Sequence, residues 1–357
     1  MRRWFAAISI AFVLLGAQGV SQTQRAALRY RSTATKRVAT ARAATAKGRS
    51  APKKVSRPAY DLAAVNNPAT ADVLKENDAG TAVLRAQIVL DRAHFSVGEI
   101  DGRVGTNTLR ALDGFRAARG LPPGQTVDRD VWNELNADMG EVLSVYTTVD
   151  ADLEGPFVEV PAEMMAKAKL DHLGYASPLD ELAERFHVNP ALLKQINPGS
   201  KFAAAGEQVI VPNVTRSPLP QAARIVVSKS ASTVTAYDDQ GNILAVYPCT
   251  SGSEHDPLPI GEWKVTGIYH NPKFHYNPIR FWDAKATDSK ATIAPGPRNP
   301  VGPVWIDLSK EHYGIHGTPA PSSIGHTQSH GCIRLTNWDA LELASIAKRG
   351  TPAILQE

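Results

Sequence analysis

The sequence predicts a multidomain α+β protein, with a mainly β domain at its C-terminal end and helical segments before it. A length of 357 residues allows two or three domains. Apolar residues recur at helical spacing between residues 79 and 135, whereas from Arg224 the period changes to that of β-strands. The two periods indicate that helices and sheet occupy different parts of the chain.

The first residues are typical of an export signal. Met1–Arg3 is basic, Trp4–Leu15 is an apolar run of signal-peptide length, and small residues suited to cleavage follow it. The run is short for a membrane span. We expect residues 1–21 to be a signal peptide and the mature protein to be exported, into a periplasm or a cell wall.

Positive charge is concentrated near the N-terminus. The formal net charge is +4, yet residues 1–60 hold thirteen Lys or Arg and all 35 acidic residues lie after them. Few large apolar side chains follow the signal, so residues 22–78 are predicted to be a basic disordered linker. This linker is either a solvated tether or an attachment to an anionic wall polymer or membrane surface. Nucleic acid is not an expected partner of an exported chain, and a monomer is expected.

Residues 79–137 are predicted to form a small domain of three helices. Leu84 and Ile88 begin one apolar helical face, Leu109 and Leu112 begin another, and a short third face follows. The stretches IDGRVGTNTLRAL and VDRDVWNEL resemble the peptidoglycan-binding domain found beside cell-wall enzymes. A small helical bundle without a ligand is the alternative.

Residues 138–222 are predicted to connect this domain to the β domain. A strand is expected over Glu141–Val149 and a helix over Pro161–Leu173. Two helices and a strand should follow at about 174–213, where LLKQINPG and GEQVIVP resemble the second half of a LysM module without its usual leading strand. This LysM-like segment either binds glycan or acts as a spacer packed against the C-terminal domain.

Residues 223–357 are predicted to be the mainly β domain. Ile225–Ser228 and Thr233–Tyr237 are rich in β-branched residues, and an Asp-Gln-Gly-Asn turn returns the chain toward Ile243–Tyr247. Asn271–Arg298 is a long polar and aromatic insertion, and long loops in compact domains are often lids or binding loops.

A helix and a strand should end the chain. Thr336 can cap a helix over Asn337–Lys348, and Asp339 stands at the capping-box position three residues later. Thr351–Leu355 is expected to be the last strand.

The most informative stretch runs from residue 315 to 335 and reads IHGTPAPSSIGHTQSHGCIRL. It contains Cys332, one of only two cysteines, with His316 on a short predicted strand and His330 two residues before the cysteine. A thiolate is an effective nucleophile, and a nearby imidazole can take the thiol proton near neutral pH. The backbone N–H groups of Gly331 and Cys332 could stabilise an oxyanion, because glycine lets the backbone approach closely.

His316-Gly317-Thr318 followed by SHGCIRL resembles the active-site signature of the L,D-transpeptidases, the YkuD-type catalytic domain. The resemblance implies a mainly β domain whose cysteine attacks a peptidoglycan tetrapeptide stem and releases the terminal D-alanine. The acyl group then passes to an amine, which forms a 3-3 crosslink or attaches a protein.

The resemblance also implies roles for individual residues. Cys332 corresponds to the nucleophile and His316 to the proton donor and acceptor, with the Gly317 carbonyl orienting the imidazole. In the insertion, aromatic side chains are candidates for substrate contacts or for a packed cap. The remaining candidates are Ser329, His330 and Gly331 around the nucleophile, and Arg334, Thr318, Tyr276 and Trp282 for substrate binding.

Other chemistries are open at this stage. The histidines between residues 312 and 330 could form a zinc site, but neither an HExxH nor a CxxC spacing is present, so we expect no metal and no cofactor. With water as the acceptor, the enzyme would be an L,D-carboxypeptidase. A peptidoglycan-binding scaffold without catalysis is the third possibility.

Cys249 is the second cysteine. In an oxidising compartment it could pair with Cys332, and such a disulfide would block the nucleophile. We expect Cys249 to be a packing residue at a strand end instead.

Overall fold

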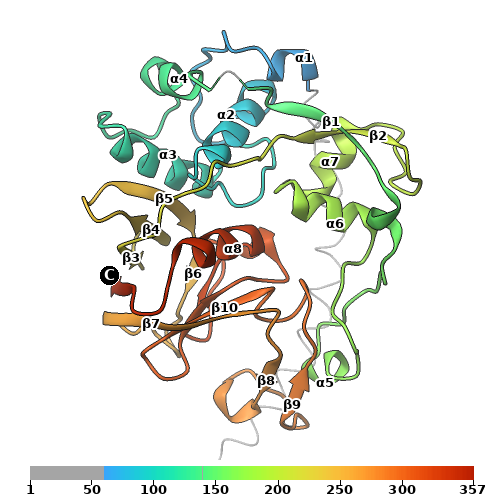
Figure 1. Cartoon of the computed structure of the whole chain (residues 1–357), viewed down its shortest axis with the longest axis vertical. Coiled ribbons are helices and arrows are strands. Elements are labelled where there is room, and N and C mark those ends of the chain that lie inside the picture. Colours follow the sequence, from blue (N-terminus) through green and yellow to red (C-terminus); the bar gives the residue numbers. More distant parts are fainter. Residues whose placement is uncertain (1–59, 139) are drawn as a thin grey trace, which may run out of the picture. The chain divides into compact units, whose positions relative to one another are not determined.

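The computed structural model describes residues 60–138 and 140–357 (Figure 1). The predicted signal peptide and most of the predicted linker lie outside these residues. The linker prediction extends too far, because residues 60–78 are folded: α1 (Leu62–Val65) begins at the cap residue Asp61, and Val65 and Leu74 are buried. Leu74 also pairs with the backbone of Val127. In the described part of the chain, no helix is long and apolar enough to cross a membrane.

Three further helices follow α1, at the positions that the apolar spacing predicts. Leu84, Ile88 and Leu112 are almost fully buried, as expected for apolar helical faces. Asp128 caps the last helix by accepting hydrogen bonds from the backbone N–H groups of Asp130 and Val131. The helices are α2 (Thr81–Arg92), α3 (Thr106–Ala118) and α4 (Arg129–Leu135).

The connecting region contains a two-stranded sheet whose strands are far apart in the sequence. The expected strand near residue 145 is β1 (Leu143–Thr147), and it pairs antiparallel with β2 (Gln208–Pro212). Between the strands lie α6 (Pro178–Arg185) and α7 (Pro190–Ile196). A strand that precedes the two helices and pairs with β2 is therefore present, but about thirty residues of intervening chain separate it from the helices.

The intervening chain differs from its prediction. The helix expected over Pro161–Leu173 is only α5 (Met164–Lys167), after the 3-10 turn η2 (Asp150–Leu153). Beyond α5, Leu173 is buried against the insertion of the C-terminal domain, and its N–H donates to the Pro295 carbonyl. Tertiary packing thus overrides the helical preference of this stretch.

Helices α2–α4 and the β1–α6–α7–β2 segment share one apolar core. This core also includes Val246 of the C-terminal sheet, and Phe95 forms a parallel bridge with it. In addition, the Ile100 N–H donates to the His187 carbonyl. The helical part therefore covers the edge strand of the sheet, which would otherwise expose unpaired backbone groups.

The C-terminal domain is built on a nine-stranded sheet with the order β5-β4-β3-β13-β7-β10-β11-β12-β6. The predicted hairpin is present: Asp238 accepts the N–H groups of Gln240 and Asn242 at the turn. The strands are β3 (Arg224–Ser228), β4 (Thr233–Tyr237), β5 (Ile243–Pro248), β6 (Thr250–Ser251), β7 (Gly261–His270), β10 (Val304–Leu308), β11 (Gly314–His316), β12 (Ile333–Arg334) and β13 (Pro352–Gln356).

Helix α8 (Asn337–Ile346) packs against this sheet, directly after the signature stretch (Figure 1). Thr336 caps it by accepting the N–H of Asp339, as the sequence predicts. The helix ends two residues earlier than expected, because Ala347 adopts an extended conformation.

The predicted insertion forms a hairpin of its own. Strands β8 (Phe274–Tyr276) and β9 (Ala291–Ile293) pair antiparallel, and the 3-10 turn η3 (Pro278–Arg280) lies between them. The hairpin packs on the α5 segment in a small apolar cluster.

One buried group of charges joins these parts, and we call it the Arg216 cluster: Arg216, Asp91, His187, Asp339 and Glu342. Arg216 lies 2.6 Å from Asp91 of α2 and 2.6 Å from Glu342 of α8. It also lies 3.4 Å from Asp339, and His187 contacts Asp91 at 2.9 Å. A buried ion pair contributes little net stability when complete, but removing one partner leaves an uncompensated charge.

We expect Arg216→Ala to lower the free energy of unfolding by about 3–5 kcal/mol, because the buried carboxylates would lose their cation. The exposed pair of Lys229 and Glu357 provides the control, and Lys229→Ala should change stability by less than about 1 kcal/mol. Chemical denaturation of both variants checks this. Equal effects of the two substitutions would show that the Arg216 cluster does not hold the parts together.

Candidate active site

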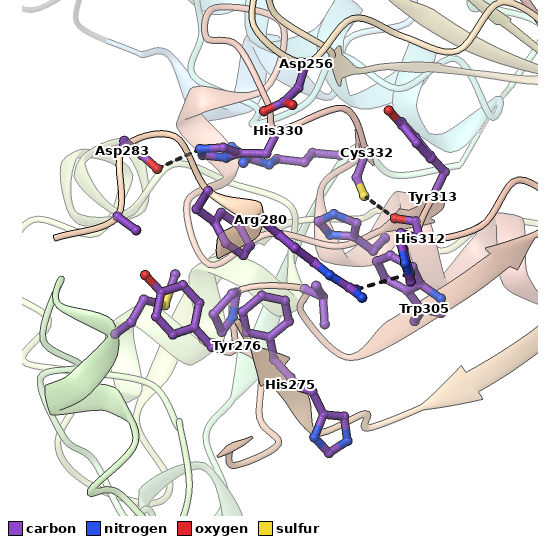
Figure 2. Close-up of a pocket in the computed structure, with 18 of the residues that line it drawn as sticks. Asp256, His275, Tyr276, Arg280, Asp283, Trp305, His312, Tyr313, His330 and Cys332 are labelled. Carbon is purple, nitrogen blue, oxygen red and sulfur yellow. Dashed lines mark hydrogen bonds and ion pairs between the residues drawn. The ribbon is translucent and has the colours of Figure 1, made fainter. Parts of the chain in front are cut away.

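Cys332 and His316 line the same cavity, which has a volume of about 720 Å³. Figure 2 shows this cavity with Cys332 in its wall. Its walls come from the C-terminal sheet, from the β8–β9 insertion and from the residues around Met164. The connecting region thus supplies one wall, a contribution that the sequence did not indicate.

Strand register places the two side chains. Strands β11 and β12 are parallel, with Ile315 opposite Ile333 and His316 opposite Arg334. Cys332 therefore stands just before β12, two positions from the level of His316. Gly331, at φ +94°, needs the left-handed conformation that favours glycine, and a Cβ there would lie 2.7 Å from the Tyr313 ring. The glycine before the cysteine is therefore a requirement of the turn.

The imidazole of His316 is buried and oriented. Its Nδ1 lies 2.7 Å from the Gly317 carbonyl oxygen. Because a carbonyl only accepts, Nδ1 carries the ring proton and donates this hydrogen bond, and Nε2 is the unprotonated, basic nitrogen. The ring stacks on Trp305 with centroids 5.3 Å apart. Burial, and then the charge of Arg334, lower the pKa of His316 to about 3. The imidazole is therefore neutral at physiological pH.

The thiol of Cys332 is also neutral in this environment. Burial raises its pKa, although the Gly314 N–H and the charge of Arg334 act in the opposite direction. The Sγ atom lies 3.7 Å from the His312 carbonyl oxygen, to which the thiol donates (Figure 2). The site therefore holds a thiol and an imidazole rather than a preformed ion pair.

Ser329 holds the turn before Cys332. Its hydroxyl donates to the Cys332 carbonyl at 2.6 Å and accepts the Gly252 N–H at 2.7 Å. The Ser329 N–H donates in turn to the Gly252 carbonyl. The cysteine thus stands on an anchored turn.

His330 lines the cavity but points toward the insertion. Its Nε2 lies 2.8 Å from Asp283 Oδ1 (Figure 2). Its ring contacts Phe281 edge-on. It precedes strand β12, as Cys332 does, so the two side chains do not share a strand face. His330 therefore contacts the β8–β9 insertion, which forms one wall of the cavity.

The residues expected to bind substrate differ in their exposure. Arg334 lines the cavity and donates to the Gln328 carbonyl at 3.4 Å. Tyr276 also lines it, but its ring is buried and its hydroxyl donates to Asp288 at 2.7 Å. Trp282 is 59% exposed and stacks on His255.

Thr318 is buried beside the cavity, with its backbone N–H bonded to Asn337. A cation missed from the sequence is Arg280, which extends across the cavity to within 3.1 Å of His312 Nδ1 (Figure 2). Arg280 lies in the insertion among aromatic residues. In the sequence, only its positive charge could have indicated a role in the cavity.

Both cysteines are free thiols in the described residues, and Cys249 is completely buried in the core of the sheet. Burial raises the pKa of Cys249 to about 12. Within residues 60–138 and 140–357, no group of three or more His, Cys, Asp or Glu side chains is arranged to hold a metal ion.

Sheet and cavity together define a class of protein: a mainly β domain that presents a cysteine thiol and a neutral imidazole to one cavity, as cysteine acyl-transfer enzymes do. The family model of the L,D-transpeptidase catalytic domain, YkuD, matches residues 222–355. The chain is 35% identical over 175 residues to the putative L,D-transpeptidase YkuD of Bacillus licheniformis, a match that covers 48% of this chain and 90% of that protein. The chain therefore belongs to the L,D-transpeptidase family and is an enzyme.

Other relatives support the same assignment. The putative L,D-transpeptidase YkuD of Bacillus subtilis is 33% identical over 174 residues, which cover 48% of this chain and 90% of that protein. The probable L,D-transpeptidase YbiS of Escherichia coli is 29% identical, and the match covers 46% of this chain but only 56% of YbiS. The assignment rests on these sequence matches. Among solved structures, one L,D-transpeptidase from Xylanimonas cellulosilytica has 15% identity and a TM-score of 0.34, with a match that covers 81% of this chain and all of that one.

The neutral state of the pair predicts how alkylation of Cys332 by iodoacetamide depends on pH. Because the pKa of the thiol is raised, the rate constant should keep rising with pH beyond neutrality, as the thiolate fraction grows. Rates measured by intact-protein mass spectrometry between pH 5 and 10 check this. Cys249→Ala should show the same profile, and a plateau from pH 5 to 7 would instead reveal a preformed thiolate.

Proposed function

We propose that this protein is an exported cell-wall enzyme in which Cys332 forms an acyl-enzyme with a peptidoglycan tetrapeptide stem and passes it to an amine. The observation that carries the proposal is the oriented, neutral imidazole of His316 in the same cavity as the thiol. A neutral base is needed because the thiol must lose its proton as it attacks.

The first half-reaction releases D-alanine. His316 Nε2 accepts the thiol proton while Sγ of Cys332 bonds to the carbonyl carbon before the terminal D-alanine. The resulting oxyanion is stabilised by the N–H groups of Gly331 and Cys332. Collapse of this intermediate breaks the C–N bond, and the imidazolium returns its proton to the leaving amine.

In the second half-reaction an acceptor amine attacks the thioester. The imidazole takes a proton from this amine, the new amide bond forms, and the thiolate leaves and regains the proton from His316. Water in place of the amine would give a carboxypeptidase. A stem that fills the cavity around Cys332 would exclude competing water and so favour transfer to an amine.

Charges in the cavity suit a peptide stem that carries carboxylates. Arg334 lies beside the nucleophile, and Arg280 crosses the cavity from the insertion. Both guanidinium groups can pair with carboxylate oxygens. We assign Arg334 to the carboxylate nearest the scissile bond and Arg280 to the remainder of the stem.

The N-terminal parts have roles in holding the wall. Helices α2–α4 would bind peptidoglycan, and the β1–α6–α7–β2 segment, with its strand-helix-helix-strand order, supports the LysM-like interpretation and glycan binding. The basic tail would attach to an anionic wall polymer or membrane surface. Export through the predicted signal would bring all of these to their substrate.

Muropeptide analysis tests the reaction. Purified protein incubated with tetrapeptide muropeptides should yield 3-3 crosslinked products by mass spectrometry, with Cys332→Ser inactive and His316→Ala slower by roughly 100- to 10,000-fold. Cys249→Ala is the matched control and should keep its activity. Tripeptides without crosslinks would assign water as the acceptor, and turnover by Cys332→Ser would contradict the cysteine mechanism.

A carbapenem should trap the acyl-enzyme. Attack of Cys332 on the strained β-lactam opens the ring to a thioester, so intact mass should show one adduct, mapped to the peptide that contains Cys332. The adduct should be absent in Cys332→Ser, and its yield should not depend on a reducing agent, because both thiols are free. Adduct that forms only after reduction would contradict this.

A further inference from the structure

The peptide group between Gly317 and Thr318 is held from both sides. Its carbonyl accepts the His316 Nδ1–H at 2.7 Å, and its N–H donates to Asn337 Oδ1 at 2.8 Å. A hydrogen bond donated by the N–H of an amide strengthens its carbonyl as an acceptor. The orientation of the imidazole therefore depends on where Asn337 places its oxygen.

Asn337 lies in the first turn of α8 and is 1% exposed. Its Nδ2 donates to Glu184 Oε1 at 2.9 Å and to the Pro297 carbonyl at 3.1 Å. Both partners accept only, so they determine which end of the amide is nitrogen and direct Oδ1 toward Thr318. If the amide turned over, Nδ2 would face the Thr318 N–H, and two donors would oppose each other.

Close packing leaves this contact little freedom. A side chain at residue 317 would collide with Asn337 Oδ1, so the glycine of the signature lets the amide approach the peptide group. Because Asn337 Oδ1 lies 2.8 Å from the Thr318 nitrogen, a small movement of Asn337 would shift the Gly317–Thr318 peptide group and, through its carbonyl, the imidazole of His316.

Glu184 is itself fixed on three sides. Its Oε1 also accepts the Tyr175 hydroxyl at 3.0 Å, and its Oε2 lies 3.1 Å from Arg298 Nη1. Arg298 is held in turn by Asp180, at 2.5 Å. Glu184 belongs to α6 and so lies outside residues 222–355, which match the family model.

We propose that Glu184 is a positioning residue for the reaction, which acts through Asn337 and the Gly317–Thr318 peptide group on His316. The inference rests on the proposed role of His316 as the base. It assigns to the connecting region a part in the chemistry as well as in binding the wall. A role in packing α6 against α8 alone would affect stability but not the state of the imidazole.

Two variants test this through the rate of carbapenem acylation and the imidazole ¹⁵N spectrum of His316. Glu184→Ala removes the acceptor, so the maximal acylation rate should fall about 10- to 100-fold with little change in half-saturation. The spectrum should show loss of the single Nδ1–H tautomer. Glu184→Gln keeps the shape of the side chain but retains only one acceptor oxygen. Its acylation rate and its ¹⁵N spectrum should therefore lie between those of the unaltered protein and those of Glu184→Ala.

Glu181→Ala provides the matched control, because Glu181 lies on the same helix and pairs with Arg185 instead. It should keep the rate and the spectrum of the unaltered protein. If Glu184→Ala does not fold, Glu184→Gln must still show the intermediate rate and the mixed tautomer. Unaltered rate and tautomer in both Glu184 variants would overturn the proposal, whatever happens to their melting temperatures.

His316→Ala in the same assay separates this proposal from the one on which it rests. A large loss of acylation in His316→Ala, together with unaltered Glu184 variants, would overturn the role of Glu184 alone. Unaltered acylation in His316→Ala would overturn the assignment of the base itself, and the role of Glu184 with it.

Discussion

The placement of helix α8 is the constraint on which the rest of the structure depends. It follows the signature stretch directly, so any shift of the helix moves the turn that carries Cys332. Its first turn holds the Gly317–Thr318 peptide group through Asn337, and its acidic residues Asp339 and Glu342 hold Arg216. The apolar side of α8 packs on the sheet. One element thus connects the sheet, the active-site peptide and the N-terminal helices.

Burial has opposite effects on the two reacting groups and makes both neutral. It raises the pKa of the thiol and lowers that of the imidazole, because a charged form loses its hydration in either case. The arrangement differs from a thiolate-imidazolium pair, in which the nucleophile is ready before substrate binds. In the proposed reaction the proton moves during attack, so the orientation of His316 matters more than the resting charge of the sulfur.

One wall of the cavity, which we call its cap, is formed by two segments that are far apart in the sequence. The β8–β9 insertion and the α5 segment share an apolar cluster around Tyr276, and both line the cavity. The part of the chain before the catalytic domain therefore shapes the entrance as well as supporting α8. This explains why residues 60–138 and 140–221 and the catalytic domain are packed together rather than joined by a free linker.

The sequence alone indicated the β domain, the proposed nucleophile Cys332 and the proposed base His316, because strand alternation, caps such as Thr336 and the spacing around Cys332 are local patterns. It also indicated the strands that became β1 and β2, but not that the two would pair. Tertiary structure decided the contacts of Glu184 and Arg216, which in the sequence look like ordinary solvent-exposed residues. Glu184 meets Asn337 across 153 positions, and no local period reports such a pairing. Only the folded chain removes these charges from water, and their partners must then come from whichever elements pack beside them.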